Sequence, residues 1–207
     1  MPTDEELVLH MLVVKGFCSA ESLAAGLTLP VTHVTAILTS LATAGTARHR
    51  DGKVSGWSPT ASGREQHQTL LTGPLAPRDM AGARVVYEEF GVLNADFKQV
   101  CTDWQIGPGR DDPTQLNDHT DAAYDDTVID RLRAIDTRVG ELCRRLDPNL
   151  PRVMGYRARL AEALGVLLEG NRDMFTKPLT GSYHDVWMEL HHDLLLSLGL
   201  QRTEADA

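Results

Sequence analysis

The sequence predicts a mainly α-helical protein, with an N-terminal domain of three short helices and a two-stranded hairpin followed by an all-helical domain of about four helices. Three observations predict this fold class. Short apolar periodic runs fill residues 4–45, and an Asp-Gly pair separates two short extended runs after them. Beyond residue 78, four long stretches repeat apolar residues at steps of three and four, as buried helix faces do.

The composition is that of an ordinary globular chain: 207 residues, of which 42% are hydrophobic and 24% charged. Residues 1–77 contain five Lys or Arg and six Asp or Glu, so almost all of the net charge of −9 belongs to the rest of the chain. Four of those five basic residues fall within 48–64. The acidity therefore belongs to the second part of the chain, and any positive patch for nucleic acid is concentrated at 48–64.

The apolar runs and the cysteines indicate the compartment. No run approaches the roughly 20 residues needed to cross a bilayer, and the N-terminus lacks the basic region of an export signal. Cys18, Cys101 and Cys143 are odd in number and far apart in apolar contexts, which favours buried thiols over a disulfide framework or a zinc site. We therefore expect a cytoplasmic protein with no membrane partner.

The first 45 residues predict three helices. A carboxylate-rich first turn begins a helix over 4–14, where the negative charges favour the positive end of the helix dipole. Ser19 can cap a second helix over 20–25. Pro30 opens a third helix, which reaches Gly45. Three short helices with a Gly-containing turn before the third are typical of a helix-turn-helix.

A hairpin follows the third helix. The extended runs 46–50 and 53–57 flank Asp51-Gly52, which predicts a two-residue type I′ turn because both central residues need positive φ. Thr60 then begins a helix to Leu71, and the Gly- and Pro-rich stretch 72–77 marks a domain boundary. We expect a first domain over 1–72 and a second over 78–207.

The order of three helices and a hairpin, with Gly45, the turn Arg50–Lys53 and the segment Thr-Ala-Ser-Gly-Arg at 60–64, resembles the winged helix-turn-helix domain of MarR-type and related bacterial transcription regulators. The resemblance covers about the first third of the chain. It implies that the helix over 31–44 enters the major groove of double-stranded DNA. It also implies that the hairpin over 48–57 lies along the backbone or minor groove.

The third helix offers hydroxyls and one imidazole to a groove but no Lys, Arg, Asn or Gln, so base readout is soft and phosphate contacts supply the affinity. We call the residues expected at the interface the DNA-contact set: Thr32, His33, Thr35, Thr39, Arg48, Arg50, Lys53 and Arg64. The alternative for its four basic members is an ordinary solvated surface.

The second domain is expected to be a bundle or a pair of helical hairpins, because four amphipathic stretches of near-heptad spacing pack at shallow angles. The expected helices cover 78–104, 118–146, 151–169 and 183–200. The expected breaks between them lie at 107–113, 147–149 and 170–181.

Polar residues interrupt two of these apolar faces. In the helix over 118–146, the steps of three and four that place apolar residues on one face lead from Val128 towards the N-terminus to three aspartates. On the last helix, two histidines lie on either side of Trp187. Carboxylates and imidazoles suit a metal site or a polar pocket, and Arg157 and Arg159 could hold an anionic ligand. We call these residues the effector set: Asp118, Asp121, Asp125, Tyr156, Arg159, His184, Trp187 and His191.

Structural roles for the effector set remain open, since aspartates in a first helical turn also favour the dipole. The sequence has no HExxH motif and no pair of histidines at i and i+4, so we predict no metal ligands and no cofactor.

Three functions are compatible with this sequence. The first is a homodimeric transcription regulator in which the acidic helical domain dimerises and senses a small molecule, since two related copies read two half-sites. The second is a protein-interaction module whose winged helix no longer contacts DNA. The third is a metal-binding or enzymatic helical bundle. Because we find no nucleophile–base pair and no Gly-rich phosphate loop, we expect no enzyme.

Overall fold

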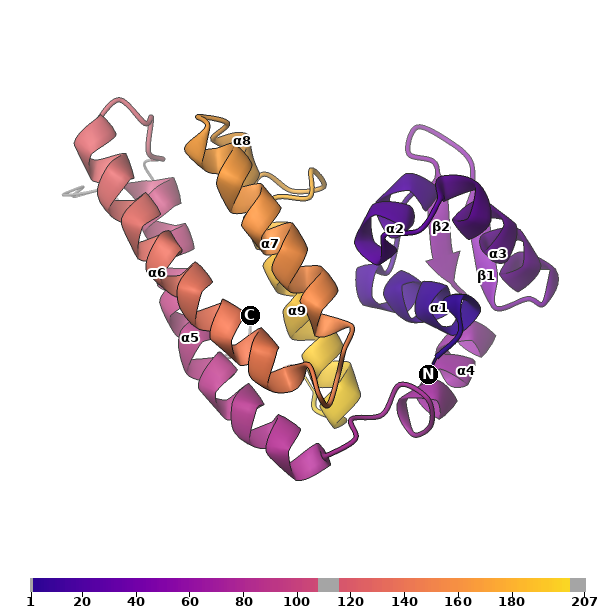
Figure 1. The fold of residues 1–207 in the computed structure, drawn as a ribbon. Helices are drawn as coiled ribbons and strands as arrows, with labels where there is room; N and C mark the ends of the chain where they lie inside the picture. The colour runs from indigo at the N-terminus through magenta and orange to yellow at the C-terminus, as the bar shows by residue number, and fades with distance from the viewer. Residues whose placement is uncertain (1, 108–115, 202–207) are drawn as a thin grey trace. The chain divides into compact units, whose positions relative to one another are not determined.

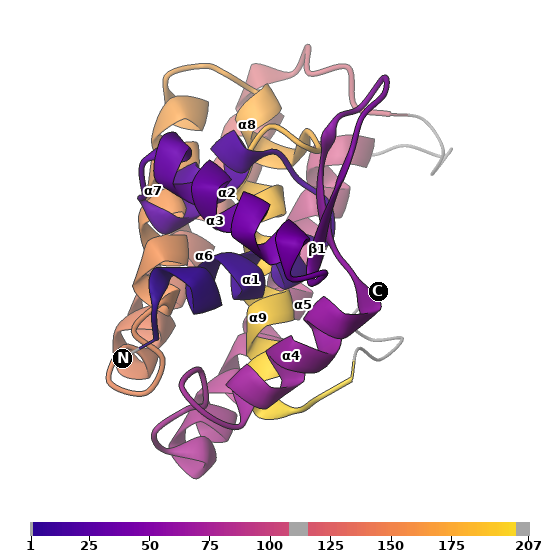
Figure 2. The same cartoon turned by 90° about the vertical axis from the view of Figure 1, so that its right-hand side faces the viewer.

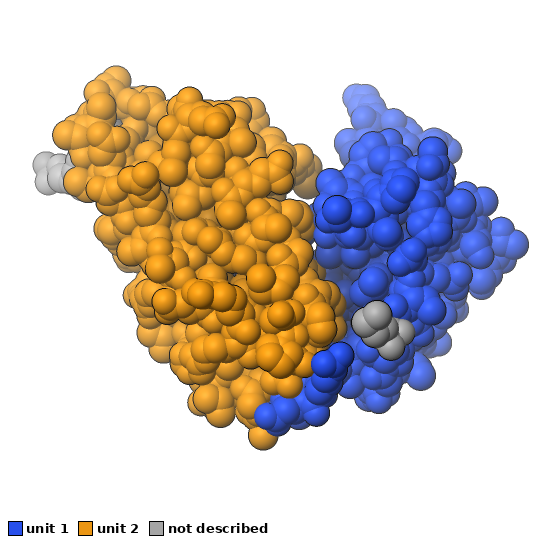
Figure 3. Space-filling view, viewed as in Figure 1, with its two compact units in different colours: residues 1–80, 187–201 blue, residues 81–186, 202–207 orange. Residues whose placement is uncertain are grey.

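The computed structural model describes residues 2–107 and 116–201, and these are mainly α-helical as predicted. The described chain divides into two compact units, coloured separately in Figure 3. Unit 1 contains the residues up to Met80 together with Trp187–Gln201, and unit 2 contains Ala81–Val186. The domain boundary expected between 72 and 78 lies close to this division, whereas the last helix is shared between the units.

Unit 1 begins with the three predicted helices (Figure 1): α1 (Asp4–Lys15), α2 (Ala20–Leu27) and α3 (Val31–Thr43). Thr3 starts α1 with a capping box, in which its side chain accepts from the Glu6 amide and Glu6 accepts from the Thr3 amide. Ser19 caps α2 as expected. The three helices bury Leu12, Leu23 and Leu38 completely, which gives unit 1 its apolar core.

The hairpin consists of β1 (Ala47–Arg50) and β2 (Gly56–Pro59), followed by α4 (Ala61–Leu71). In the turned view of Figure 2 its loop extends away from α4. Arg50 pairs with Gly56, so the loop has five residues and the predicted two-residue turn is wrong. The reason lies outside the hairpin, because Trp57 exchanges backbone hydrogen bonds of 3.1 and 2.8 Å with Cys18. That pairing sets the register of β2.

Gly56 is required at this register. A Cβ atom on Gly56 would lie 2.7 Å from the Phe17 ring and 2.9 Å from the Cys18 carbonyl oxygen. Both distances are shorter than van der Waals contact, so β2 can approach the segment between α1 and α2 only because residue 56 has no side chain.

Unit 2 contains α5 (Met80–Ile106), α6 (Ala122–Leu146), α7 (Val153–Leu168), the short α8 (Asp173–Thr176) and the first turn of α9 (Tyr183–Leu198). The apolar faces predicted for these helices are buried, for example at Phe90, Leu132 and Leu160. Two details differ from the prediction: α6 begins at Ala122 instead of Asp118, and α8 interrupts the expected break at 170–181. The expected break at 107–113 lies outside the described residues apart from Gly107.

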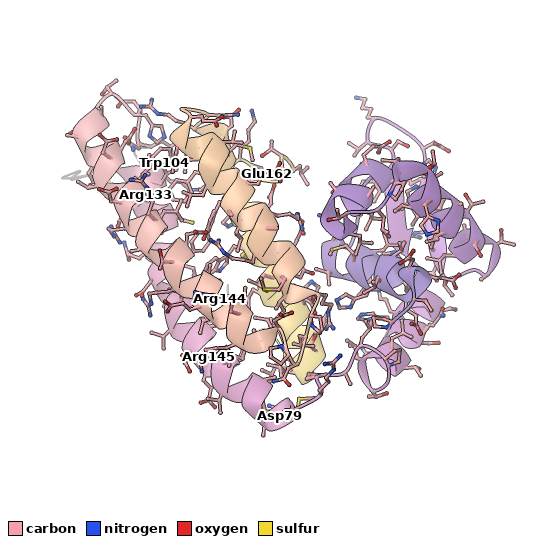
Figure 4. All side chains as sticks on the ribbon, viewed as in Figure 1. Asp79, Trp104, Arg133, Arg144, Arg145 and Glu162 are labelled. Carbon is pink, nitrogen blue, oxygen red and sulfur yellow. The ribbon has the colours of Figure 1, made fainter. Side chains whose placement is uncertain are left out.

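The register of α5 against α6 is marked by ion pairs that repeat every seven residues on both helices. They join Arg131 to Asp103, Arg138 to Asp96 and Arg145 to Glu89, at 2.5, 2.8 and 2.6 Å. Arg145 is labelled near one end of α6 in Figure 4. The residue numbers rise along α6 while those of their partners fall along α5, so the two helices are antiparallel. Exposed pairs contribute little stability, and these serve chiefly to fix the register.

Helix α9 carries residues of both units. Its first turn belongs to unit 2, and from Trp187 onward it packs with the N-terminal elements of unit 1. There Glu189 forms an ion pair with Lys15, and the His192 ring lies 2.9 Å from the Val14 carbonyl oxygen. The region predicted as one domain over 78–207 therefore contributes a helix to unit 1.

In the described part of the chain, no single helix is long and apolar enough to cross a bilayer. Helices α2 and α3 meet the length and hydropathy requirement only together, across a bend of 116°.

Candidate nucleic-acid interface

The eight residues of the DNA-contact set are all exposed and all belong to unit 1. Helix α3 carries four of them because it buries Val34, Ile37, Leu38 and Leu41 on its other side. The basic members lie on β1 (Arg48 and Arg50), in the hairpin loop (Lys53) and in the first turns of α4 (Arg64). The structure thus separates an uncharged, hydroxyl-rich helix from the cations beside it.

Three hydroxyl groups of α3 are turned towards the backbone of their own helix. The side chains of Thr35, Thr39 and Thr43 donate to the carbonyl oxygens four residues earlier, at 2.8, 2.9 and 3.0 Å. Val31, which is 40% exposed, begins the same row. Thr43 was absent from the DNA-contact set, although its spacing of four from Thr39 could have identified it.

Three further members of the DNA-contact set contact side chains of other elements in unit 1. His33 on α3 lies 2.9 Å from an Asp4 carboxylate oxygen on α1, and both side chains are about half exposed. The Arg48 guanidinium donates to the Ser58 hydroxyl at 3.1 Å across the hairpin. The Arg50 guanidinium lies 5.0 Å from the centre of the Phe17 ring, within range of a cation–π interaction. Contacts within unit 1 thus position the two arginines of β1, Arg48 and Arg50.

A tight joint connects the hairpin to α4. Thr60 caps α4 by accepting from the Gly63 amide at 3.1 Å, and its hydroxyl is 2.7 Å from the Gly45 carbonyl oxygen. A Cβ atom on Gly63 would lie 2.0 Å from the Thr46 carbonyl oxygen. The joint therefore needs glycine at position 63, and it fixes Arg64 beside the start of β1.

Four buried polar side chains connect α9, α1 and α4 inside unit 1, and each is at most 3% exposed. The Ser197 hydroxyl donates to Asp193 at 2.8 Å, and the other Asp193 oxygen lies 3.0 Å from His10 Nε2. His10 Nδ1 lies 2.8 Å from His67 Nε2, which completes the chain.

These four buried side chains stabilise unit 1 and do not form a catalytic site. The serine contacts the carboxylate and not an imidazole, so the arrangement is not a nucleophile–base pair, and its burial keeps substrates away. None of its members was predicted. The one sequence signal was a histidine at position 10 inside the apolar run Leu7–Val14.

The effector set is dispersed. Asp118 and Asp121 are exposed, and Asp121 caps α6 by accepting from the Tyr124 amide at 3.0 Å. Trp187 and His191 are buried in unit 1. His184 belongs to unit 2, where its ring stacks on Phe97 with centroids 6.2 Å apart and burial lowers its pKa.

Two further members of the effector set lie on α7, where Tyr156 is buried and Arg159 is partly exposed. The neighbouring Arg157 is not available to a ligand, since it bonds both Asp136 oxygens at 2.6 and 2.9 Å. The Tyr183 hydroxyl also donates to Asp136, at 3.2 Å. This cluster ties α6, α7 and the first turn of α9 together.

Asp125, a further member of the effector set, lines a cavity of about 430 Å³ in unit 2. It is buried and accepts hydrogen bonds from Asn117 and His119, while Arg172 lies 3.3 Å away. The remaining lining residues include three apolar side chains and further charges of both signs: Ile129, Leu167, Leu168, Asp126, Asp130 and Arg133. Arg133 is labelled in Figure 4.

Metal and thiol chemistry have little support in the described residues. Over residues 2–107 and 116–201, no group of three or more His, Cys, Asp or Glu side chains could hold a metal ion. Burial raises the pKa of the Cys18 and Cys101 thiols to about 12 and that of Cys143 to about 11. Their thiolate forms are therefore scarce at neutral pH, which makes them poor nucleophiles.

No family model, no curated protein and no solved structure matches this chain. Three helices followed by a two-stranded hairpin, with α3 exposed beside the hairpin, have the shape of a winged helix.

Proposed function

We propose that the protein is a DNA-binding transcription regulator related to the MarR type, in which unit 1 binds double-stranded DNA through α3 and the hairpin. The observation that carries the proposal is the exposure of the whole DNA-contact set on one winged-helix-shaped unit. Its cations sit on the hairpin and α4, where they can neutralise phosphates, and α3 presents small side chains to base edges.

The charge distribution supports one mode of approach. The chain carries a net charge of −9, but four of the five basic residues in its first 77 residues belong to the interface. A DNA polyanion is repelled by the acidic remainder and attracted by this cluster, so the interface is the surface that DNA meets first.

The proposal includes a homodimer. A single winged helix reads one half-site, and two copies related by a two-fold axis read two half-sites about 10 base pairs apart or a multiple of that. Light scattering should therefore give a mass of twice the 22.7 kDa chain. A monomeric mass at the concentrations that bind DNA would contradict this part of the proposal.

A small-molecule effector is the regulatory part of the proposal, and the cavity beside Asp125 is its candidate site. Arginines and aspartates both line the cavity, so a zwitterionic ligand such as an amino acid suits it best. Because α9 belongs partly to each unit, an effector that favours one conformation of unit 2 can shift DNA affinity through this helix.

If a ligand binds this cavity, it should raise the melting temperature (Tm) of the protein. A zwitterion from an amino-acid panel, added at about 100 times its Kd, should raise the Tm by several degrees. The Arg172→Gln variant should lose the shift, because it removes the cation next to Asp125. Lys177→Gln, which removes an exposed cation outside the cavity, should keep it. An undiminished shift in Arg172→Gln would rule out this cavity.

If the hairpin contacts phosphates, removing its cations Arg50 and Lys53 should change the salt dependence of DNA binding. The double variant Arg50→Gln/Lys53→Gln should lower affinity for duplex DNA at least about tenfold. It should also reduce the slope of log Kobs against log[salt] by about 2, because each phosphate contact releases nearly one counterion. Fluorescence anisotropy with a labelled duplex over a salt series measures both quantities.

The matched control is Arg84→Gln/Lys177→Gln, which removes the same charge from exposed positions in unit 2. It should leave affinity and slope unchanged. If both double variants weaken binding equally, the effect is one of net charge and the hairpin is not the contact. That result would favour the second candidate function, a protein-interaction module whose winged helix does not contact DNA.

A further inference from the structure

We propose that the row Thr35, Thr39 and Thr43 reads the 5-methyl groups of thymines in the major groove, so that the preferred half-site is defined by thymine positions. This inference rests on the proposed DNA binding and adds the chemistry by which bases are chosen. It explains how a helix without Lys, Arg, Asn or Gln can select a sequence.

First, the hydroxyl groups of the three threonines are already engaged in hydrogen bonds within α3. Each of the three threonines donates its hydroxyl hydrogen to a backbone carbonyl at 2.8 to 3.0 Å. What remains on the exposed face is a γ-methyl group and the oxygen lone pairs of each side chain. Such a side chain is a poor hydrogen-bond donor to guanine O6 or N7, but it offers apolar contact to a thymine methyl group.

The second step is the spacing. Threonines four residues apart on an α-helix are separated by about 6 Å along the axis, which is close to two base-pair steps of about 3.4 Å. Val31, with 40% of its surface exposed, continues the methyl row by one more position. The row therefore matches thymines at every second position of a half-site.

The third step is access. Between these threonines the exposed positions carry only small side chains, namely Ala36 and Ser40, and the larger His33 side chain lies before the first of them, where it contacts Asp4 of α1. A helix surface without long side chains can lie close to the base edges, and close approach is what a methyl–methyl contact requires.

The test is uracil scanning. A duplex is first enriched from a random pool with the full-length protein, and each thymine is then replaced by uracil, which removes only the methyl group. Loss of one buried methyl contact should weaken binding about fourfold at each contacted position. Thr39→Ser, which removes the methyl group and keeps the hydroxyl, should lower affinity for the thymine duplex by a similar factor and abolish the uracil effect at one position.

Two further variants complete the test. Thr39→Val keeps the methyl group and should retain the uracil effect. Thr137→Ser alters a threonine of α6 that also donates to the carbonyl four residues earlier, at 3.1 Å, and it should change nothing.

The outcomes separate this inference from the proposed function. Specific binding to the enriched duplex that is insensitive to every uracil replacement overturns the methyl readout alone. A uracil effect that persists unchanged in both Thr35→Ser and Thr39→Ser also overturns it. Failure to enrich any duplex overturns both the inference and the proposed function.

Discussion

Replacing Gly63 with alanine should lower the free energy of unfolding by about 3 kcal/mol, at the upper end of the usual cost of overpacking. The added Cβ atom would lie 2.0 Å from the Thr46 carbonyl oxygen, and this neighbour is backbone that cannot rotate away. Relief requires α4 to move from the start of β1. The same variant should therefore also lose DNA affinity, because Arg64 moves with α4.

The control is Gly91→Ala in α5, where nothing lies within 4 Å of the added atom. Alanine should stabilise that helix by up to about 1 kcal/mol, since glycine costs entropy in a helix interior. Urea unfolding followed by tryptophan fluorescence compares the two variants. A Gly63→Ala protein as stable as the parent would show that the joint between hairpin and α4 is looser than described.

Replacing Asp193 with alanine should cost about 3 kcal/mol of unfolding free energy, because it removes one partner from a buried charged chain. His10 loses its carboxylate, and Ser197 keeps only the backbone carbonyl oxygen of residue 193 as an acceptor, at 2.7 Å. Both side chains are almost fully buried. The segment of α9 in unit 1 should then become susceptible to proteolysis. Limited proteolysis and urea unfolding measure the two consequences.

Graded controls accompany this variant. Ser197→Ala removes one hydrogen bond and should cost about 1 kcal/mol. Asp173→Ala removes an exposed aspartate of α8 and should change stability by no more than about 0.5 kcal/mol. Equal effects of Asp193→Ala and Asp173→Ala would contradict a stabilising role for the buried chain.

The helices of this protein could be predicted from sequence because their signals are local. Steps of three and four placed Phe90, Leu132 and Leu160 in the core, and Ser19 and Thr60 marked helix starts that the structure confirms. The fold class followed from those signals.

The hairpin register could not be predicted because its determinant is distant. Asp51-Gly52 favours a two-residue turn locally, but the pairing of Trp57 with Cys18 shifts the register and leaves a five-residue loop. The role of Asp121 was also not predictable from spacing. Its position continues the apolar face of the predicted helix, but the structure places it before α6, as the N-terminal cap of that helix.

The candidate interface was partly visible in the sequence. Exposure of the four members of the DNA-contact set on α3 follows from the spacing of apolar and polar residues along that helix. The contact of His33 with Asp4 and the chain from Ser197 to His67 join residues that are far apart in sequence, up to 183 positions for His10 and Asp193. No local pattern encodes such contacts, which depend on how α9 packs in unit 1.

The central claim is that unit 1 recognises duplex DNA by sequence. The most direct measurement is the affinity of the full-length protein for an enriched duplex and for a shuffled duplex of the same composition, at 150 mM salt. We predict that the enriched duplex binds at least about 100-fold more tightly, which is modest for specific recognition because α3 lacks bidentate side chains. Equal affinity for the two duplexes, or no enrichment at all, would contradict the claim.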